Sequence, residues 1–193
     1  MTHPMQKAED RFTYRQLLTW PEGERWELID GIAYDMTPAP TTPHQRISGR
    51  LFNQFFNYLD GKSCEVFAAP FDVLLPMGNE TEEEVDTVVE PDITIVCDHN
   101  KLTERGCFGA PELVVEILSP STARKDLREK FAAYQRAGVR EYWIVDPANR
   151  LVTVYRLGEN QRYGQSEIFA PEDTVSVEVL EGLTIDLSRI FAE

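Results

Sequence analysis

A carboxylate interrupts the most apolar segment of the chain. Val114 and Val115 precede Glu116, and Ile117 and Leu118 follow it. Alternate residues of a strand share a face, and both faces of this segment are apolar, which predicts a central strand covered on both sides. An ionised carboxylate buried there is costly unless a cation, a metal ion or a hydrogen-bond network compensates its charge. Glu116 is therefore the first candidate for chemistry.

The helix predicted after this strand supplies a cation. It covers STARKDLREKFAAYQRAG and ends at Gly138. At about 100° per residue, Lys130 lies on the apolar face of this helix together with Tyr134, whereas Lys125 lies on the opposite face. We expect Lys130 to reach Glu116 and Lys125 to face solvent. The alternative is a purely structural ion pair, or a lysine whose stem packs while its amine reaches water.

A second carboxylate stands at the start of the predicted strand PDITIV, where Asp92 follows Pro91. If this strand pairs antiparallel with the strand of Glu116, the start of one lies beside the end of the other, and the two acids are neighbours. Adjacent carboxylates repel each other, and a divalent cation removes that repulsion. Mg²⁺ takes oxygen ligands and needs few from the protein. Asp92 and Glu116 therefore predict a site for Mg²⁺ or Mn²⁺.

Four more polar residues are candidates for supporting roles. Asp72 follows a proline on a neighbouring strand and is either a further metal ligand or an edge-strand charge. His44 lies on the apolar stripe of its helix and either serves the site or is satisfied by backbone. Glu27, in WELIDG, points to the site from the first strand in one interpretation. Asp126 lies one turn before Lys130 and is placed to orient it.

The outer face of the same helix carries a strip of positive charge, consisting of Arg124, Lys125, Arg128 and Arg136. The chain as a whole has a net charge of −14, which opposes attraction to nucleic acid because phosphate binding depends on lysine and arginine. A nucleic-acid site must then be a local basic patch, and this strip adjoins the predicted acids. We expect it to contact phosphates; the alternative is a solvated helix face.

Length and composition indicate one globular domain over residues 1–193, with residues 1–11 as a flexible tail. The chain is 42% hydrophobic and 27% charged. It has no apolar run of membrane-spanning length and no apolar region of a secretory signal, so we expect a cytoplasmic protein. Its three cysteines are odd in number and form no C-x-x-C pair, which favours free thiols over a disulfide or a zinc site. The acidic segment 79–92 is predicted to be mostly a solvated loop.

The predicted elements mix strands with two long helices, which favours one α/β sheet with helices on its faces. A short helix leads to a hairpin that turns at Asp30-Gly31, and a strand and a helical turn close the chain. The long helices are predicted over residues 41–61 and 121–138, and the other strands over residues 64–76, 91–98, 113–119, 140–147 and 151–157.

Several motifs together resemble a known family. They are WELIDG, His44 in the first long helix, VEPDI, GAPELVVEILSPST, DLREK, YQRAGVREYWIVDP and VTVYR. The set is similar to a widespread prokaryotic family described as restriction endonucleases, within the PD-(D/E)xK nuclease superfamily. The resemblance implies a restriction-endonuclease-like mixed central sheet flanked by helices, a homodimer, and Mg²⁺-dependent hydrolysis of phosphodiester bonds, most of all in DNA.

The sequence departs from the superfamily pattern at Leu118, where a lysine belongs two residues after the acid. The resemblance implies that this lysine has moved to Lys130. It also implies that Asp92 and Glu116 hold the metal ion, with a carbonyl near Ile117 as a further ligand, and that Lys130 orients water or stabilises the phosphoryl charge.

Two other functions stay open. The first is a catalytically inactive module of the nuclease fold that acts in protein or nucleic-acid interaction. The net acidity and Leu118 favour it, whereas the convergence of Asp92, Glu116 and Lys130 favours the nuclease. The second is a metal-dependent hydrolase of another phosphate ester. The sequence contains no recognisable target-reading element.

Overall fold

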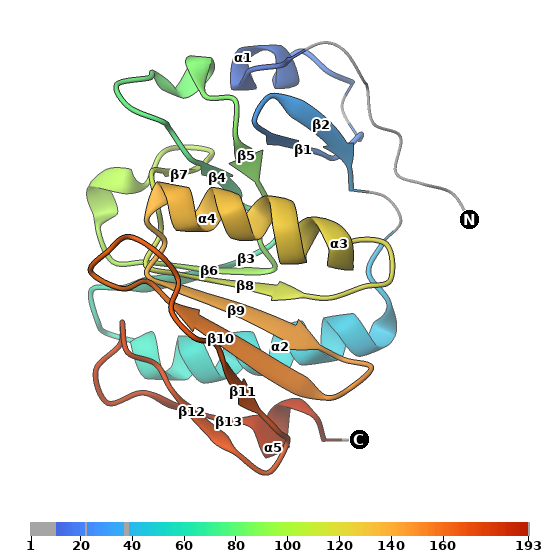
Figure 1. Cartoon of the computed structure of the whole chain (residues 1–193), viewed down its shortest axis with the longest axis vertical. Coiled ribbons are helices and arrows are strands. Elements are labelled where there is room, and N and C mark those ends of the chain that lie inside the picture. The colour runs from blue at the N-terminus through green and yellow to red at the C-terminus, as the bar shows by residue number, and fades with distance from the viewer. Residues whose placement is uncertain (1–10, 22, 37–38, 193) are drawn as a thin grey trace.

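The computed structural model describes residues 11–21, 23–36 and 39–192, and they form a mixed α/β fold. A six-stranded sheet has the order β11-β10-β9-β8-β6-β3, and a five-stranded sheet has the order β2-β1-β5-β4-β7. A small third sheet pairs β12 with β13. The α/β class is confirmed, but the expectation of one sheet is wrong, because the strands divide between two large sheets (Figure 1).

The elements have the following bounds. The six-stranded sheet contains β3 (Glu65–Ala68), β6 (Ile93–Val96), β8 (Leu113–Ile117), β9 (Glu141–Asp146), β10 (Leu151–Arg156) and β11 (Glu167–Phe169). The other strands are β1 (Trp26–Ile29), β2 (Ile32–Asp35), β4 (Asp72–Leu74), β5 (Val88–Val89), β7 (Gly106–Phe108), β12 (Thr174–Ser176) and β13 (Thr184–Asp186). The helices are α1 (Tyr14–Leu17), α2 (Thr42–Leu59), α3 (Ala123–Lys125), α4 (Phe131–Ala137) and α5 (Leu187–Ile190). A π-helical turn (Asp126–Lys130) joins α3 to α4, and short 3-10 turns cover Glu82–Glu84 and His99–Lys101.

The central strands of the six-stranded sheet carry the predicted acids. Strand β6 runs antiparallel to β8, with Ile93 opposite Val115. Asp92 immediately precedes β6, so this register places it beside Glu116 at the end of β8. Strand β8 runs parallel to β9 on its other side. Strand β8 is therefore hydrogen-bonded to a neighbouring strand on each side, as expected for a central strand.

The two faces of this sheet have different covers. Leu113, Val115 and Ile117 pack with α2 in one core, which explains the apolar stripe of that helix. Val114 faces the opposite core, which contains α4 and side chains of the five-stranded sheet. Because residues two apart share a face, Glu116 lies on this second side, under the helix that carries Lys130. The side chain of Glu116 thus faces the layer between the two large sheets.

The hairpin β1–β2 turns at Asp30 and Gly31, as predicted. Their φ angles are +51° and +74°, the combination that two-residue turns of type I′ require and that Asp-Gly supplies. This hairpin belongs to the five-stranded sheet, where β1 also pairs with β5. The hairpin brings Glu27, which was predicted from the first strand, into the layer between the sheets.

Part of the acidic segment 79–92 is more ordered than a solvated loop. It contains a 3-10 turn and strand β5, and Thr87, Val88 and Val89 are buried. The prediction is therefore wrong for its second half, because β5 pairs with both β1 and β4 and is the middle strand of its sheet.

The cysteine prediction is also wrong in one respect. Cys64 and Cys97 form a disulfide, whereas Cys107 is free and buried. Glu65 pairs with Val96 in the β3–β6 ladder, so the next residues along, Cys64 and Cys97, face each other across the two strands. Cross-strand register of this kind depends on long-range pairing, which cysteine number and spacing do not reveal.

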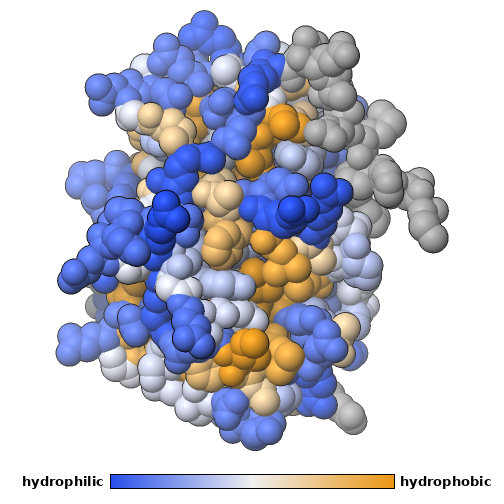
Figure 2. All heavy atoms as spheres, in the orientation of Figure 1, coloured by the Kyte–Doolittle hydropathy of each residue, from blue (hydrophilic) through white to orange (hydrophobic). Residues whose placement is uncertain are grey.

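The face that carries α3 and α4 mixes hydrophilic side chains with smaller hydrophobic areas (Figure 2). The large hydrophobic residues exposed on the molecule include Leu127 in the π-helical turn and Ile168 in β11. Within residues 11–21, 23–36 and 39–192, none of the helices combines the length and apolarity that crossing a membrane requires.

Candidate active site

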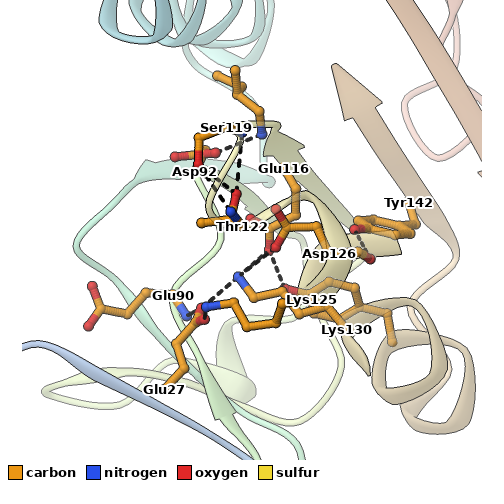
Figure 3. Close-up of polar contacts among 12 residues, drawn as sticks. Glu27, Glu90, Asp92, Glu116, Ser119, Thr122, Lys125, Asp126, Lys130 and Tyr142 are labelled. Carbon is orange, nitrogen blue, oxygen red and sulfur yellow. Dashed lines mark hydrogen bonds and ion pairs between the residues drawn. The ribbon is translucent and has the colours of Figure 1, made fainter. Parts of the chain in front are cut away.

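Lys130 and Glu116 form the centre of a buried polar cluster (Figure 3). The Lys130 Nζ lies 2.8 Å from the Glu116 Oε1, and both side chains are almost fully buried. The acid comes from β8 and the amine from the π-helical turn above it. The sequence-based expectation that Lys130 reaches Glu116 is confirmed in its geometry.

Glu27 joins this pair from the other sheet. Its Oε1 lies 2.6 Å from the Lys130 Nζ and accepts a hydrogen bond of 2.9 Å from the backbone N–H of Glu90. Glu27 is fully buried. Lys130 therefore links one carboxylate of each large sheet, and the site lies at the seam between the sheets.

Lys125 does not face solvent, contrary to the expectation. Its amine contacts the Glu27 Oε2, and its side chain is only 11% exposed. The cause is the π-helical turn between α3 and α4, in which hydrogen bonds span five residues, so that Lys125 and Lys130 come to the same side. An α-helical wheel, which assumes 100° per residue, separates them.

The predicted basic strip is correspondingly smaller. Arg124 and Arg128 are exposed, but Arg136 lies at the other end of the helix, where its NH2 group is 2.5 Å from the Asp30 Oδ1. Arg136 is thus paired with the hairpin turn and is not adjacent to the acids. Two arginines, instead of four basic residues, are left on the outer face beside the cluster.

Asp92 lies beside the end of β8, as predicted. Its Oδ2 accepts a hydrogen bond of 2.7 Å from the backbone N–H of Ile117 and lies 3.3 Å from the His44 Nε2. His44 is in the first turn of α2, and both side chains are partly buried. The structure therefore brings His44 to the cluster, through Asp92.

Two further residues hold the central pair in place. Asp126 is buried, and its Oδ1 lies 3.8 Å from the Lys130 Nζ, in agreement with the orienting position predicted for it. Tyr134 donates a hydrogen bond of 2.6 Å to the Glu116 Oε1. The sequence analysis placed Tyr134 only on the apolar stripe of the helix. Tyr134 lies four residues after Lys130, so both side chains lie on one side of the helix, and this spacing could have indicated that they share Glu116 as a partner.

Asp72 lies elsewhere. Strand β4 belongs to the five-stranded sheet, and the Asp72 Oδ2 accepts a hydrogen bond of 3.0 Å from the Tyr14 hydroxyl. Burial raises the pKa of Asp72, partly offset by this hydrogen bond and by Arg105. In the part of the chain that the structure describes, no three acidic, histidine or cysteine side chains are arranged to hold a metal ion together. Any metal ion would depend on fewer side chains than the predicted set of Asp92, Glu116 and Asp72.

The charges of the cluster do not balance. The cluster contains four carboxylates, those of Glu27, Asp92, Glu116 and Asp126, and the two amines of Lys125 and Lys130, which gives a formal charge of −4 + 2 = −2 with His44 counted as neutral. Burial lowers the pKa of Lys130, but Glu116, Glu27 and Asp126 outweigh it, so the pKa is raised well above 10.5 and the amine is charged.

The two lysines compensate the negative charge of Glu27 more completely than that of Glu116. Burial raises the pKa of Glu27, but the charges of Lys130 and Lys125 outweigh burial and lower it to about 2. Burial raises the pKa of Glu116 well above 4.5, because the charge of Lys130 does not outweigh burial and the repulsion from Asp126, Asp92 and Glu27. The positive charge around Glu116 is therefore too small to compensate its buried carboxylate.

A divalent cation fits these residues. It would cancel the net charge of −2, and carboxylates are the ligands that Mg²⁺ and Mn²⁺ prefer. The Oδ1 of Asp126 is buried without a hydrogen-bond partner among the described residues, which also indicates an unfilled demand for positive charge. Asp92 and Glu116, neighbours at the open end of the strands, are the two residues that would hold the ion.

Comparison with known proteins agrees with this fold. Residues 13–188 match the model of a family described as "Uma2: Putative restriction endonuclease". Because the match covers most of the 193 residues, the chain belongs to the Uma2 family.

Two individual proteins are similar to the chain. A Synechocystis protein, described as "Uncharacterized protein slr1290", is 30% identical over 148 residues, which are 75% of this chain and 74% of that protein. The crystal structure of a protein from Anabaena variabilis, described as "a putative nuclease belonging to DUF820", matches with a TM-score of 0.74 at 21% identity. That match covers 94% of this chain and 98% of the other, and it shows that the two share a fold.

Proposed function

We propose that the chain is an endonuclease that depends on Mg²⁺ or Mn²⁺ and hydrolyses phosphodiester bonds in DNA. The observation that carries this proposal is the placement of Lys130 on Glu116, beside Asp92 and at the end of two paired strands. An acid pair with an adjacent amine is the arrangement that phosphoryl transfer requires for a metal ion and for charge stabilisation.

In this proposal Asp92 and Glu116 hold the metal ion. When bound there, the ion polarises a phosphate oxygen and lowers the pKa of a bound water. Tyr134 fixes one oxygen of Glu116 through its hydrogen bond, which leaves the other oxygen for the ion. His44 orients Asp92. Burial lowers the pKa of His44, but the hydrogen bond and charge of Asp92 outweigh burial and raise it.

The lysines supply positive charge. The Lys130 amine has three donors, two of which are used by Glu27 and Glu116, and in this proposal the third is donated to a water or a phosphate oxygen. Glu27 positions both lysines, since its two oxygens contact one amine each. Arg124 and Arg128, exposed on the outer side of α3 and the π-helical turn, would contact phosphates next to the site.

The catalytically inactive module is the second candidate, and one observation favours it. Lys130 is only 2% exposed and already lies within 4 Å of three carboxylates. A buried network that satisfies its own charges can be retained for structure alone. In that case the chain would bind a partner and cut nothing.

Cleavage of supercoiled plasmid and of single-stranded DNA, titrated with Mg²⁺ and Mn²⁺, tests the proposal. We expect metal-dependent cleavage that Glu116→Ala abolishes. Asp72→Asn is the matched control, because it neutralises a part-buried acid outside the cluster, and it should cleave like the unaltered chain. Equal cleavage by the chain and by Glu116→Ala would indicate a contaminating nuclease. No cleavage of either substrate at millimolar metal, by a chain that binds DNA, would establish the inactive module.

A further inference from the structure

A second cluster of positive charge lies on α2, outside the cluster of acids and lysines. A groove of about 460 Å³ is lined by Arg46, Arg50, Asn53 and Gln45 from α2, and by Arg189 from α5. Three guanidinium groups face it, and no acidic side chain is among its lining residues. On a chain with a net charge of −14, such a groove is a local exception. Its arginines are distinct from those on the helix that carries Lys130.

Two of these arginines are available to a ligand. Arg46 and Arg189 are exposed, and neither forms an ion pair in the part of the chain that the structure describes. Asp186 interacts electrostatically with Arg189, but its carboxylate accepts hydrogen bonds from the N–H and hydroxyl of Ser188. Counting Asp186, the groove has a formal charge of 3 − 1 = +2.

Arg50, the third arginine of the groove, also has a structural role. Its NH1 group donates to the carbonyls of Ile190, at 3.1 Å, and of Ala192. This contact fixes α5 against α2 and so holds Arg189 opposite Arg46. A guanidinium has five N–H donors, and Arg50 therefore keeps donors for the groove.

The groove leads away from the proposed catalytic residues. His44, which contacts Asp92, lies on α2 just before Arg46 and Arg50. At a rise of 1.5 Å per residue, these arginines lie about 3 and 9 Å along the helix axis from His44. One strand of B-DNA presents a phosphate about every 3.4 Å of axis. At about 100° per residue, Arg46 and Arg50 project from a different side of α2 than His44, so a strand that passes the acids would have to curve around the start of α2 to reach the groove.

The positions of the surrounding helices and strands agree with a nucleic-acid strand that passes over the acids and into the groove. The start of α2, the end of β8 and α3 lie at the right of Figure 1, with α3 above the end of β8 and α2 below it, and α5 lies at the bottom, beneath α2. Arg124 and Arg128 on one side and the α2–α5 groove on the other thus flank the end of the strands where Asp92 and Glu116 lie. A strand of nucleic acid laid across these acids would meet positive charge on both sides.

We propose that the α2–α5 groove binds the phosphate backbone of the nucleic acid that the site cuts. The identity of the ligand rests on the proposed function. Arg46 and Arg189 make the phosphate contacts, and the side-chain amides of Gln45 and Asn53 add neutral donors. The lining residues include no aromatic side chain that could stack on a base. The groove therefore holds the strand without reading its sequence.

Duplex binding measured by fluorescence anisotropy, in EDTA and over a range of KCl concentrations, tests this proposal. The test variant is Arg46→Gln/Arg189→Gln, which spares Arg50. The control is Arg140→Gln/Arg162→Gln, which removes two exposed charges near the opposite end of β9 and β10. Each lost phosphate contact lowers the slope of log K against log[salt] by about 0.9. We expect the test variant to lose about 1.8 in slope and about 60-fold in affinity at 0.1 M salt, and the control to match the unaltered chain.

Three results would overturn the proposal: equal slopes for the test variant and the control, no duplex binding by the unaltered chain, or displacement of the duplex by micromolar pyrophosphate. The last would show a small phosphate ester as the ligand. The assay contains no free divalent metal ion, so it is independent of cleavage. A chain that binds through the groove without cutting keeps this inference and rejects the nuclease. A chain that cuts while both double variants bind alike rejects the groove alone.

Discussion

The amines of Lys125 and Lys130 contact the two oxygens of one carboxylate, that of Glu27. The lysines come from the helical segment over the six-stranded sheet, and Glu27 comes from β1 of the five-stranded sheet. The π-helical turn makes this possible, since it brings residues five apart to one side. The contact therefore joins the two sheets as well as arranging the charges.

Lys130→Met should abolish metal-dependent cleavage and lower stability. The substitution keeps the packed stem but leaves Glu27, Glu116 and Asp126 buried without their shared cation. Removing one partner from a buried charge network costs about 3–5 kcal/mol. Urea unfolding at pH 7, followed by circular dichroism, measures the loss. A stability equal to that of the unaltered chain would show that the carboxylates do not depend on Lys130.

Lys125→Met should also lower both activity and stability, though less than Lys130→Met. Its amine pairs with the single carboxylate of Glu27 and lies over the Tyr34 ring, and Lys130 still compensates Glu27. We expect a loss of about 1–3 kcal/mol, as for one unsatisfied partner of a buried charge. Arg124→Met, one position earlier and exposed, is the control and should leave stability unchanged within about 0.5 kcal/mol. If the two variants unfold alike, Lys125 is not part of the network.

Mg²⁺ or Mn²⁺ at millimolar concentration should raise the melting temperature, because an ion that binds only the folded chain stabilises it by mass action. Asp92→Asn should remove most of this rise. Asp72→Asn should retain it, since Asp72 is bound to Tyr14 and lies outside the cluster. Differential scanning fluorimetry with each metal measures the shift. A rise that Asp72→Asn removes and Asp92→Asn keeps would move the metal site to the five-stranded sheet.

The fall in the free energy of unfolding below pH 4.5 should depend on Glu27. Its pKa falls from 4.5 in the unfolded chain to about 2 in the fold, despite burial, because of Lys130 and Lys125. A lowered pKa contributes stability above pH 4.5 that is lost as the pH falls towards 2. The shift corresponds to about 3 kcal/mol. Unfolding free energies of the unaltered chain and Glu27→Gln, measured between pH 2 and 6, should therefore converge as the pH falls. Parallel profiles would contradict the lowered pKa.

Reduction of the Cys64–Cys97 disulfide should lower stability without disturbing the cluster. The bond closes a segment with a sequence separation of 33, which corresponds to about 3–4 kcal/mol of chain entropy. Dithiothreitol should thus lower the melting temperature, and Cys64→Ser/Cys97→Ser should be insensitive to it. Mass spectrometry after alkylation of the unfolded, unreduced chain should find one modified cysteine, Cys107. Three modified cysteines would show that the bond does not form.

Local patterns predicted the centre of the site well. Alternation along a strand identified the faces of Asp92 and Glu116, and an apolar stripe interrupted by one amine identified Lys130. These inferences depend on the periods of 2 and 3.6 residues, which a single sequence displays. The same patterns predicted α2, the β1–β2 turn and the hairpin of β9 and β10.

Long-range and irregular features were not predictable in the same way. The π-helical turn has no residue signature, so a regular wheel placed Lys125 on the wrong side. The division into two sheets depends on β4 pairing with β5 and β7 instead of continuing β3, which moved Asp72 away from the acids. The disulfide required the β3–β6 register. Each of these is set by tertiary pairing, which overrides local propensity.

The seam between the sheets also sets when the buried cluster can form during synthesis of the chain. Glu27 and Lys130 are 130 − 27 = 103 positions apart in the sequence, so the first of them leaves the ribosome well before the second. At about 5–20 residues per second, the delay is on the order of 5–20 s. Throughout that interval the nascent chain has an acid without its lysines, so the cluster of the proposed nuclease cannot be assembled until the helical segment has been synthesised.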